Sequence, residues 1–471
     1  MTSPREVGAP SVGPTSRGAT TGMSALVSLG GSSVIAAIAA LLIAIARAPA
    51  SNFIYDAGVY WVAAVAVTRG DDFFTLGGLP IRGALTAFIY VPAALLSILV
   101  GPESGPAAVL VQNSVLIAIL GAVLIPALVR LFVSVPPLLV YASAITTALL
   151  LGGMVPYPLV DLWALSLVLF ALVLVGRAPA SWVRLGVAGF LLGAALNLRP
   201  AYLVPVVLIV VAWVVFSRLR VLATIGGVAL ALVPQVVINA VSKGSWVPWP
   251  VNAFVVTDVQ TKYAGYIVRY DTLVQATDVS SAQLFYCNPG MASRFLSGTP
   301  GSMGELAMSF VEHLPVSLKF VTQKVAASLH WTSQTPYSGN PSNELSALTL
   351  AVVAVSSIGF LGLIWFVLRR RESGSTSARM VPVLALWAGS VATLAFATPE
   401  ARFALPVLVL GIVGCLIVVG SRPGVLMPSA SGVLFIAGAG LLTAGLLWLG
   451  QSGLAHPADP GDATARICSE T

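Results

Sequence analysis

Apolar residues occur along most of this chain in long runs that short polar stretches separate. The runs fall near 24–46, 84–100, 107–129, 134–153, 159–176, 185–198, 201–217, 221–241, 346–368, 380–397, 403–420 and 430–450. About 20 apolar residues, rising 1.5 Å each in a helix, cover the roughly 30 Å hydrocarbon core of a bilayer. The pattern therefore predicts an all-α polytopic membrane protein.

The composition agrees with this fold class, since 57% of the residues are hydrophobic and 9% are charged. The net charge of +7 is no sign of nucleic-acid binding, because membrane proteins retain excess Lys and Arg in their cytoplasmic loops. Residues 1–22, rich in Gly, Ser, Thr and Pro, are predicted to be a disordered cytoplasmic tail. The run 24–46 is too long for the apolar region of a signal peptide, so it is predicted to be a retained first span.

The distribution of arginines in the short loops predicts the topology. If every run after residue 100 crosses the membrane, most of these arginines share one side, which should be cytoplasmic. That side carries Arg130, Arg177, Arg184, Arg218, Arg220, Arg369, Arg370, Arg371, Arg379 and Arg422. Arg199 and Arg402 fall on the other side. The tail should be cytoplasmic as well, so an even number of spans must separate it from Arg130. The run 84–100 then cannot cross and is predicted to be a membrane-surface helix, which leaves about eleven spans with the N-terminus inside.

This topology divides the chain into membrane and extracytoplasmic parts. We expect an N-terminal transmembrane module at 23–241, whose first outer loop is 47–83, and a C-terminal module at 346–450. Residues 242–345 should form a small extracytoplasmic domain, and 451–471 an extracytoplasmic tail. Several charged residues then gather at the outer face, where charges at a membrane edge usually mark a substrate path. They are Asp56, Asp71, Asp72, Arg82, Asp161, Arg199, Glu400 and Arg402.

Short motifs in this outer face carry a resemblance to a known superfamily. The first outer loop contains the runs YDAGVYW, RGDDFF and GLPIR, and FIYVPAAL, GAALNLRP and PEARFALP follow further on. In order and topology they resemble the GT-C superfamily of integral membrane glycosyltransferases, which use polyprenyl-phosphate sugars. The likeness is to mannosyltransferase-like and arabinosyltransferase-like members. The usual acidic pair after the first span is Asp56-Ala57 here, which leaves the subfamily and the sugar open.

The resemblance implies roles in catalysis and binding for the acidic residues of the first outer loop. Asp56 would be the general base that deprotonates an acceptor hydroxyl. The alternative is that Asp56 caps a short helix in the loop. Asp71 and Asp72 form a turn beside Gly70, or hold sugar hydroxyls or a divalent cation such as Mg²⁺ or Mn²⁺. Tyr60, in the same run as Asp56, is a further substrate-binding candidate.

The resemblance also implies a phosphate site. Arg82, Arg199 and Arg402 would stabilise the departing lipid phosphate, because a guanidinium binds phosphate oxygens in a bidentate way. The alternative for each is an interfacial arginine that reaches the lipid headgroups. Asp161 and Glu400 either orient these arginines or form plain structural ion pairs with them.

The outer segment 242–345 offers weaker signals. Its many aromatic residues either stack on sugars or build a small core and an interfacial belt, and the structural role is favoured. An amphipathic stretch at 306–330, with Lys319, Lys324 and His330, is expected to rest on the bilayer surface. Cys287 and Cys468 both fall outside the membrane, where a disulfide between them would persist, whereas Cys415 lies within a span and is expected to pack there.

We therefore expect a plasma-membrane glycosyltransferase that moves a mannose-class or pentose-class sugar from a polyprenyl monophosphate to an envelope glycan, glycolipid or protein. The reaction would take place on the extracytoplasmic face, with inversion at the sugar. Two alternatives remain open at this point, a lipid or sugar-lipid transporter and a non-catalytic envelope-assembly protein. The charges lie at the outer face rather than at mid-bilayer in paired broken helices, which argues against a transporter.

Overall fold

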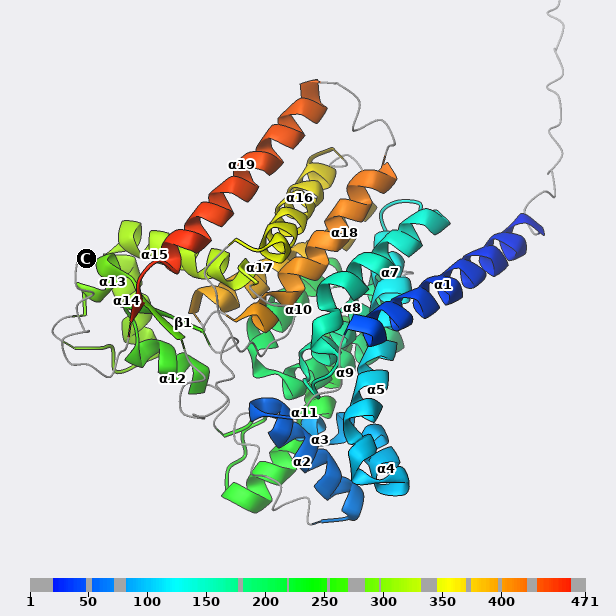
Figure 1. The fold of residues 1–471 in the computed structure, drawn as a ribbon, viewed down its shortest axis with the longest axis horizontal. Helices are drawn as coiled ribbons and strands as arrows, with labels where there is room; N and C mark the ends of the chain where they lie inside the picture. The colour runs from blue at the N-terminus through cyan, green and yellow to red at the C-terminus, as the bar shows by residue number, and fades with distance from the viewer. Residues whose placement is uncertain are drawn as a thin grey trace, which may run out of the picture.

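The computed structural model describes residues 20–47, 53–71, 82–176, 181–217, 220–251, 255–269, 284–295, 298–331, 345–369, 374–396, 400–421 and 430–458. Every apolar run named from the sequence is helical, and the helices enclose one large apolar core (Figure 1). The α-helices are α1 Thr20–Arg47, α2 Tyr55–Arg69, α3 Leu85–Ile89, α4 Val91–Val100, α5 Gly105–Ile119, α6 Ile125–Val129, α7 Pro137–Leu151, α8 Asp161–Gly176, α9 Trp182–Leu198, α10 Leu203–Ser217, α11 Val221–Lys243, α12 Val255–Lys262, α13 Pro289–Ala292, α14 Met303–Glu312, α15 Leu314–Leu329, α16 Ala347–Arg369, α17 Gly374–Phe396, α18 Leu405–Ser421 and α19 Ala430–Gly453. The shorter helical turns include η2 Pro102–Ser104, the π-turn η3 Leu120–Leu124, η4 Gly152–Met154, η5 Pro200–Tyr202 and η8 Ala401–Ala404.

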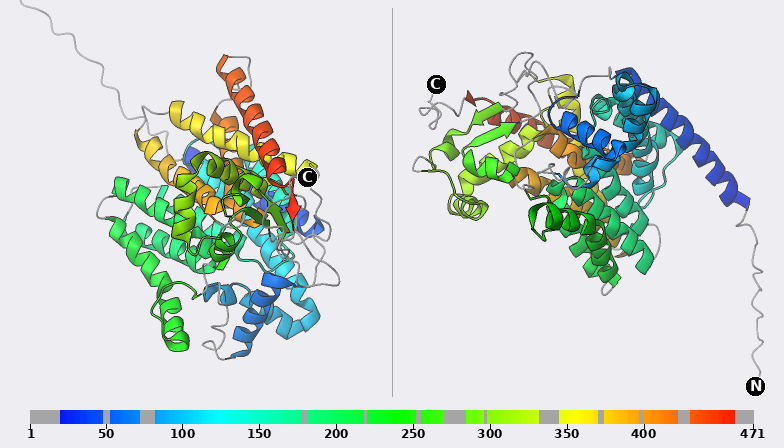
Figure 2. Two further views of the ribbon diagram at one scale, coloured as in Figure 1. Left: turned by 90° about the vertical axis from the view of Figure 1, so that its left-hand side faces the viewer. Right: turned by 90° about the horizontal axis from the view of Figure 1, so that it is seen from below.

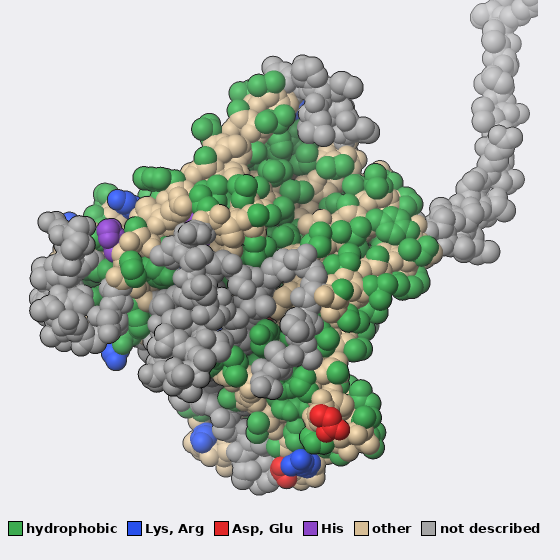
Figure 3. Space-filling model, viewed as in Figure 1, with side chains coloured by type: hydrophobic (Ala, Val, Ile, Leu, Met, Phe, Trp, Pro, Cys, Tyr) green, Lys and Arg blue, Asp and Glu red, His purple; other side chains and the backbone are tan. Residues whose placement is uncertain are grey.

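Seven helical segments of the described chain are long and apolar enough to cross a membrane. They are Pro102–Val129, Pro137–Met154, Val221–Lys243, Ala347–Arg369, Arg379–Phe396, Ala401–Ser421 and Gly432–Gly453. Shorter apolar helices accompany them, among them α8, α9 and α10. Apolar side chains are also spread widely over the described part of the face drawn in Figure 3, where charged side chains are few. The chain is thus a helical protein with several candidate membrane spans.

The helices pack as neighbouring pairs. α1 lies against α5 and α7, α9 lies between α8 and α11, α10 packs on α17, and α16 packs on α18. Small residues permit the closest of these contacts. A Cβ on Gly359 in α16 would overlap the backbone of Gly411 in α18, so the two helices touch through bare backbone at this point.

The segment 84–100 is interrupted. It forms the short helix α3 and then α4, whose ten residues rise only about 15 Å, half the hydrocarbon thickness.

The structure also changes two predictions for the chain that precedes this segment. The first outer loop contains the 15-residue helix α2, which its Ala-rich sequence favours and which the left-handed Gly70 ends. In addition, α1 already begins at Thr20, within the expected tail, and residues 1–19 lie outside the described chain.

The segment after α11 forms a compact domain at the opposite end of the molecule from the N-terminal part of α1 (Figures 1 and 2). Its sheet has the order β1-β2-β3, all antiparallel, and α12 to α15 pack around it. The strands are β1 Tyr266–Arg269, β2 Leu284–Cys287 and β3 Pro457–Ala458. Because β3 follows α19, the chain returns to this domain after its last long helix. The start of the expected C-terminal tail is therefore ordered.

The structure tests the predictions made for the aromatic residues of this domain and for the cysteines. Tyr263, Tyr266 and Phe285 pack edge to face, which agrees with the structural role favoured for the aromatic residues. Cys287 is disulfide-bonded and Cys415 is a free thiol. Cys468, the partner expected for Cys287, lies outside the described residues.

The expected surface helix at 306–330 is corrected in part. It is broken at His313 into α14 and α15, and α15 packs against α17, α19 and η8. Lys319 is exposed, but Lys324 and His330 are buried inside the protein. Periodicity alone could not reveal this, because the groups that Lys324 contacts come from α12 and α17, which are remote in sequence.

Candidate functional site

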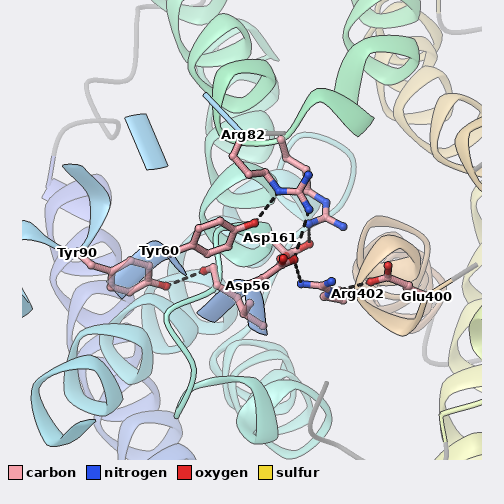
Figure 4. A network of polar contacts seen from close by, with 9 residues as sticks. Asp56, Tyr60, Arg82, Tyr90, Asp161, Glu400 and Arg402 are labelled. Carbon is pink, nitrogen blue, oxygen red and sulfur yellow. Dashed lines mark hydrogen bonds and ion pairs between the residues drawn. The ribbon is translucent and has the colours of Figure 1, made fainter. Parts of the chain in front are cut away.

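Six charged side chains that lie far apart in sequence meet in one cluster at the ends of helices (Figure 4). They are Asp56, Arg82, Asp161, Arg199, Glu400 and Arg402. Each sits where the backbone enters or leaves a helix. The charges balance, since three guanidinium groups face three carboxylates. The sequence predicted all six of these residues to share one face, and their contacts confirm that they lie together.

Asp56 lies in the first turn of α2 but does not cap it. The N-cap position is Ile54, whose side chain makes no capping hydrogen bond. Instead, Asp56 Oδ2 accepts hydrogen bonds from Arg402 Nη1 at 3.0 Å and Arg82 Nη2 at 3.5 Å. The capping alternative for Asp56 is therefore wrong. Tyr55, directly before it, has a φ of +48°, a conformation that a bulky residue adopts only where its surroundings enforce it.

Exposure separates Asp56 from the rest of the cluster. Its side chain is 25% exposed, whereas the other five charged side chains are at most 7% exposed. Burial would raise the pKa of Asp56, but the positive charges of Arg402 and Arg82 outweigh it and lower the pKa from 3.8 to about 2. Asp56 is thus an ionised carboxylate that an incoming molecule can reach.

Arg82 is fixed through its Nε atom. This atom donates a 2.6 Å hydrogen bond to the hydroxyl of Tyr60, one turn after Asp56 on α2. Burial raises the pKa of Tyr60 to about 12, so its phenol stays protonated at neutral pH. Tyr60, predicted as a substrate-binding residue, is buried, and in this structure its hydroxyl orients Arg82.

The backbone that follows Arg82 is held by two buried amide side chains that sequence reasoning missed. The amides of Ala84 and Leu85 donate to Gln235 Oε1 at 2.8 Å and Asn197 Oδ1 at 2.9 Å. Gly83 donates to the Asn197 carbonyl at 2.9 Å, and a Cβ on Gly83 would overlap that carbonyl. These are amides at the start of α3 that have no partner within the helix. Polar residues inside the apolar runs that form α9 and α11 were the only signal for this contact.

Arg402 is fixed in the same manner as Arg82. Its Nε donates to Glu400 Oε2 at 2.6 Å, and both residues lie at the start of the segment that becomes α18. The compact domain after α11 supports this segment, because α15 packs against η8. Lys324 of α15 donates from Nζ to the carbonyl of Ala395 at 3.0 Å, near the C-terminus of α17. A buried lysine therefore ties this domain to the chain just before Glu400.

Arg199 forms a separate pair. It is in ion-pair contact with Asp161, and its guanidinium lies 4.2 Å from the centre of the Phe403 ring. Both charged side chains are 3% exposed. Among the described residues, Arg199 Nη2 has no hydrogen-bond partner, and a cavity of about 20 Å³ lies beside it. That volume holds about one water molecule. Arg199 thus stays with Asp161, while Arg82 and Arg402 converge on Asp56.

A buried polar network positions Asp161. Tyr90 donates to the carbonyl of Leu159 at 2.6 Å and to Asn113 Oδ1 at 3.1 Å. Asn113 in turn donates to the carbonyls of Val155 and Tyr157. The non-helical stretch that leads into α8 is therefore held from α5, and Asp161 starts α8 at a defined place.

The remaining acidic candidates lie away from the cluster or outside the described chain. Asp71 is exposed just beyond the far end of α2, about 20 Å along the helix from Asp56. The turn predicted beside Gly70 is present, since Gly70 is left-handed. Asp72 lies outside the described residues, and within the described ones no three His, Cys, Asp or Glu side chains are arranged so that they could hold a metal ion.

Arg184, one of the arginines predicted for the opposite side, is also separated from the cluster. Arg199 follows the last residue of α9, and Arg184 lies in the first turn of the same 17-residue helix, about 22 Å away along its axis.

Comparison with known proteins identifies no relative, since no protein-family model, no curated protein and no solved structure matches the chain.

Proposed function

We propose that this protein is an integral membrane glycosyltransferase of GT-C type that transfers a sugar from a polyprenyl monophosphate to an envelope acceptor. The observation that carries the proposal is the exposed carboxylate of Asp56 held between two arginines. This arrangement brings together the two groups that such a transfer needs, a proton acceptor and cations for a phosphate. The sequence motifs that supply these residues are the ones on which the resemblance rests.

In the proposed reaction the acceptor hydroxyl attacks the anomeric carbon of the sugar. Its proton passes to the Oδ1 atom of Asp56, which accepts no hydrogen bond from the described residues. The bond from the anomeric carbon to the phosphate oxygen breaks at the same time, and the lipid monophosphate leaves with the electron pair. Arg82 and Arg402 stabilise its negative charge. Direct displacement of this kind inverts the anomeric centre.

The proposed setting is the plasma membrane, with about eleven spans, a cytoplasmic N-terminus and the site on the extracytoplasmic face. Helices α3 and α4 would lie in the outer leaflet, because α4 is too short to cross. The domain formed by 242–345 would stand outside the membrane above the site. Arg184 at the far end of α9 would face the cytoplasm.

The test uses membranes that contain the protein, a panel of radiolabelled polyprenyl-phosphate hexoses and pentoses, and an envelope fraction as acceptor. We expect transfer by the wild-type protein, loss of at least about 100-fold in Asp56→Asn, and normal transfer in Asp71→Asn. Asp71 is the matched control because it removes one charge from the exposed far end of the same helix. Full transfer by Asp56→Asn would refute the base assignment. Lack of transfer by the wild-type protein with every sugar would favour a transporter or an assembly protein.

A further inference from the structure

The hydrogen bonds of Arg82 and Arg402 divide into two kinds. Each arginine uses its Nε atom for a short bond of 2.6 Å, Arg82 to Tyr60 and Arg402 to Glu400. Each then directs one terminal Nη atom toward Asp56 at a longer distance, 3.5 Å from Arg82 and 3.0 Å from Arg402. Charge-assisted hydrogen bonds weaken as they lengthen beyond about 2.9 Å. The Nε contacts therefore act as anchors, and the contacts with Asp56 are the ones that exchange most easily.

Both guanidinium groups converge on one oxygen of Asp56. Oδ2 takes both contacts, and Oδ1 takes none from the described residues. Two cations that converge on one anionic oxygen form the same arrangement that binds an oxygen of a phosphate. Asp56 is also the most exposed charged side chain of the cluster, so an anion that arrives from outside meets this pair first.

The rest of the cluster cannot supply a free cation. Arg199 is buried in its contact with Asp161 and in its stacking on Phe403. The cluster as a whole is neutral, with three positive and three negative groups. A phosphate that enters while Asp56 still holds both arginines would lack a cation as its direct partner in a largely buried site, which is costly.

We propose that Asp56 occupies the phosphate site of the empty protein, and that the lipid phosphate displaces Asp56 from Arg82 and Arg402 when it binds. This inference rests on the proposed function, because it concerns the same site. The Nε anchors on Tyr60 and Glu400 stay in place, so the exchange needs only a movement of the Asp56 side chain. The two arginines then hold the phosphate, and Oδ2 of Asp56 loses both of its partners.

The exchange couples donor binding to the start of the reaction. While both arginines hold Asp56, its pKa stays near 2, so it is a poor proton acceptor. Once they turn to the phosphate, burial is the main influence left, and burial raises the pKa of a carboxylate. Asp56 would therefore become an effective base only after a donor has arrived, and water or an acceptor alone would not be deprotonated.

The proposal makes a counter-intuitive prediction for binding. If Asp56 competes with the phosphate, Asp56→Asn removes the negative charge that both arginines contact and should bind a lipid phosphate more tightly than the wild-type protein, by at least about tenfold given the short charge separations. The probe is undecaprenyl monophosphate without a sugar, titrated into purified protein in detergent and measured by native mass spectrometry. Asp56→Ser serves as a second variant if Asp56→Asn does not fold.

Matched probes and variants identify the cause of any gain in affinity for the monophosphate. Undecaprenol, which lacks the phosphate, should bind equally to all variants, and inorganic phosphate should compete only if the headgroup alone is recognised. Asp71→Asn should leave the affinity for the monophosphate unchanged. Arg402→Gln should weaken binding both alone and in the Asp56→Asn background.

Unchanged or weaker binding of the monophosphate by Asp56→Asn, or an equal gain in Asp71→Asn, would overturn the exchange. So would an absence of binding to the wild-type protein and to both Asp56 variants. Because this assay contains no sugar and no acceptor, a lack of transferase activity would leave its result intact. Conversely, suppose that sugar transfer requires Asp56 while Asp56→Asn binds the monophosphate no more tightly than the wild-type protein. That pair of results would refute the exchange and leave the proposed function intact.

Discussion

Replacing Lys324 by methionine should change how the stability of the protein depends on pH. Lys324 is fully buried in α15, and its Nζ bonds only to uncharged groups, Gln260 Oε1 at 2.8 Å and the Ala395 carbonyl at 3.0 Å. Burial lowers its pKa from 10.5 to about 7. Methionine fills a similar volume without a charge.

The size and sign of the effect follow from this pKa. Below pH 7 both the folded and the unfolded protein carry the charge, so the full cost of burying it is present, about 5 kcal/mol at 1.36 kcal/mol per unit. Above pH 7 the folded protein releases the proton while the unfolded protein still holds it, up to pH 10.5. The unfolded state then binds more protons, so stability rises with pH. Between pH 6 and pH 9 this group should add about 3 kcal/mol.

The assay is unfolding of the purified protein in mixed micelles with rising SDS fraction, followed by circular dichroism at pH 6 and pH 9. The gain in unfolding free energy from pH 6 to pH 9 should be about 3 kcal/mol smaller in Lys324→Met than in the wild-type protein. Lys319→Met, an exposed position on the same helix, should keep the wild-type dependence. Burial and the nearby Arg269 lower the pKa of His330 from 6.5 to about 4, so His330 also adds some pH dependence near pH 6, but both proteins contain it and its contribution cancels in the comparison. An equal pH dependence in Lys324→Met and the wild-type protein would refute the reasoning.

Three further substitutions test the architecture around the site. Gln235→Leu leaves a buried amide at the start of α3 without its acceptor, at a cost of about 1–3 kcal/mol, so hydrogen exchange of 83–85 measured by mass spectrometry should accelerate. Asp161→Asn leaves the charge of Arg199 buried and unpaired and should lower the unfolding free energy by about 3–5 kcal/mol. The double variant Asp161→Asn/Arg199→Met should recover most of that loss. A loss in the double variant as large as in Asp161→Asn would contradict this explanation. Gly359→Val should lower the thermal midpoint of unfolding by forcing α16 from α18, whereas Gly440→Val, which meets nothing nearby, should not.

The sequence predicted the helices and the membership of the charge cluster well, for different physical reasons. A run of apolar residues is a local signal, and a bilayer-spanning helix needs little beyond it, so the runs correspond to helices in the structure. Arg82, Arg199 and Arg402 could be grouped because the loops alternate between two sides of a membrane. Neither inference required knowledge of which helices touch.

The pairing within the site could not be predicted, because it depends on packing between distant segments. Nothing near Tyr60 indicates that its hydroxyl meets Arg82, and nothing near Gln235 indicates a contact with the start of α3. The burial of Lys324 was missed for the same reason, since its neighbours come from α12 and α17. A short helix in the first outer loop was raised only as the alternative in which Asp56 caps it, because the length and composition of this stretch suit a loop with or without a helix.

The distance in sequence between Asp56 and Arg402 has a consequence for biosynthesis. The two residues are 346 positions apart, yet they share a hydrogen bond. At ribosomal rates of about 5–20 residues per second, roughly 20–70 seconds pass between the synthesis of one and the other. During that interval the rest of α2 and the helices α3 to α17 are made while Asp56 still lacks Arg402. The carboxylate must wait in a nascent chain that already occupies the translocon and the lipid. A chain truncated before α18 would therefore keep most of its helices but have an unfinished centre, and quality-control proteases would meet it in that state.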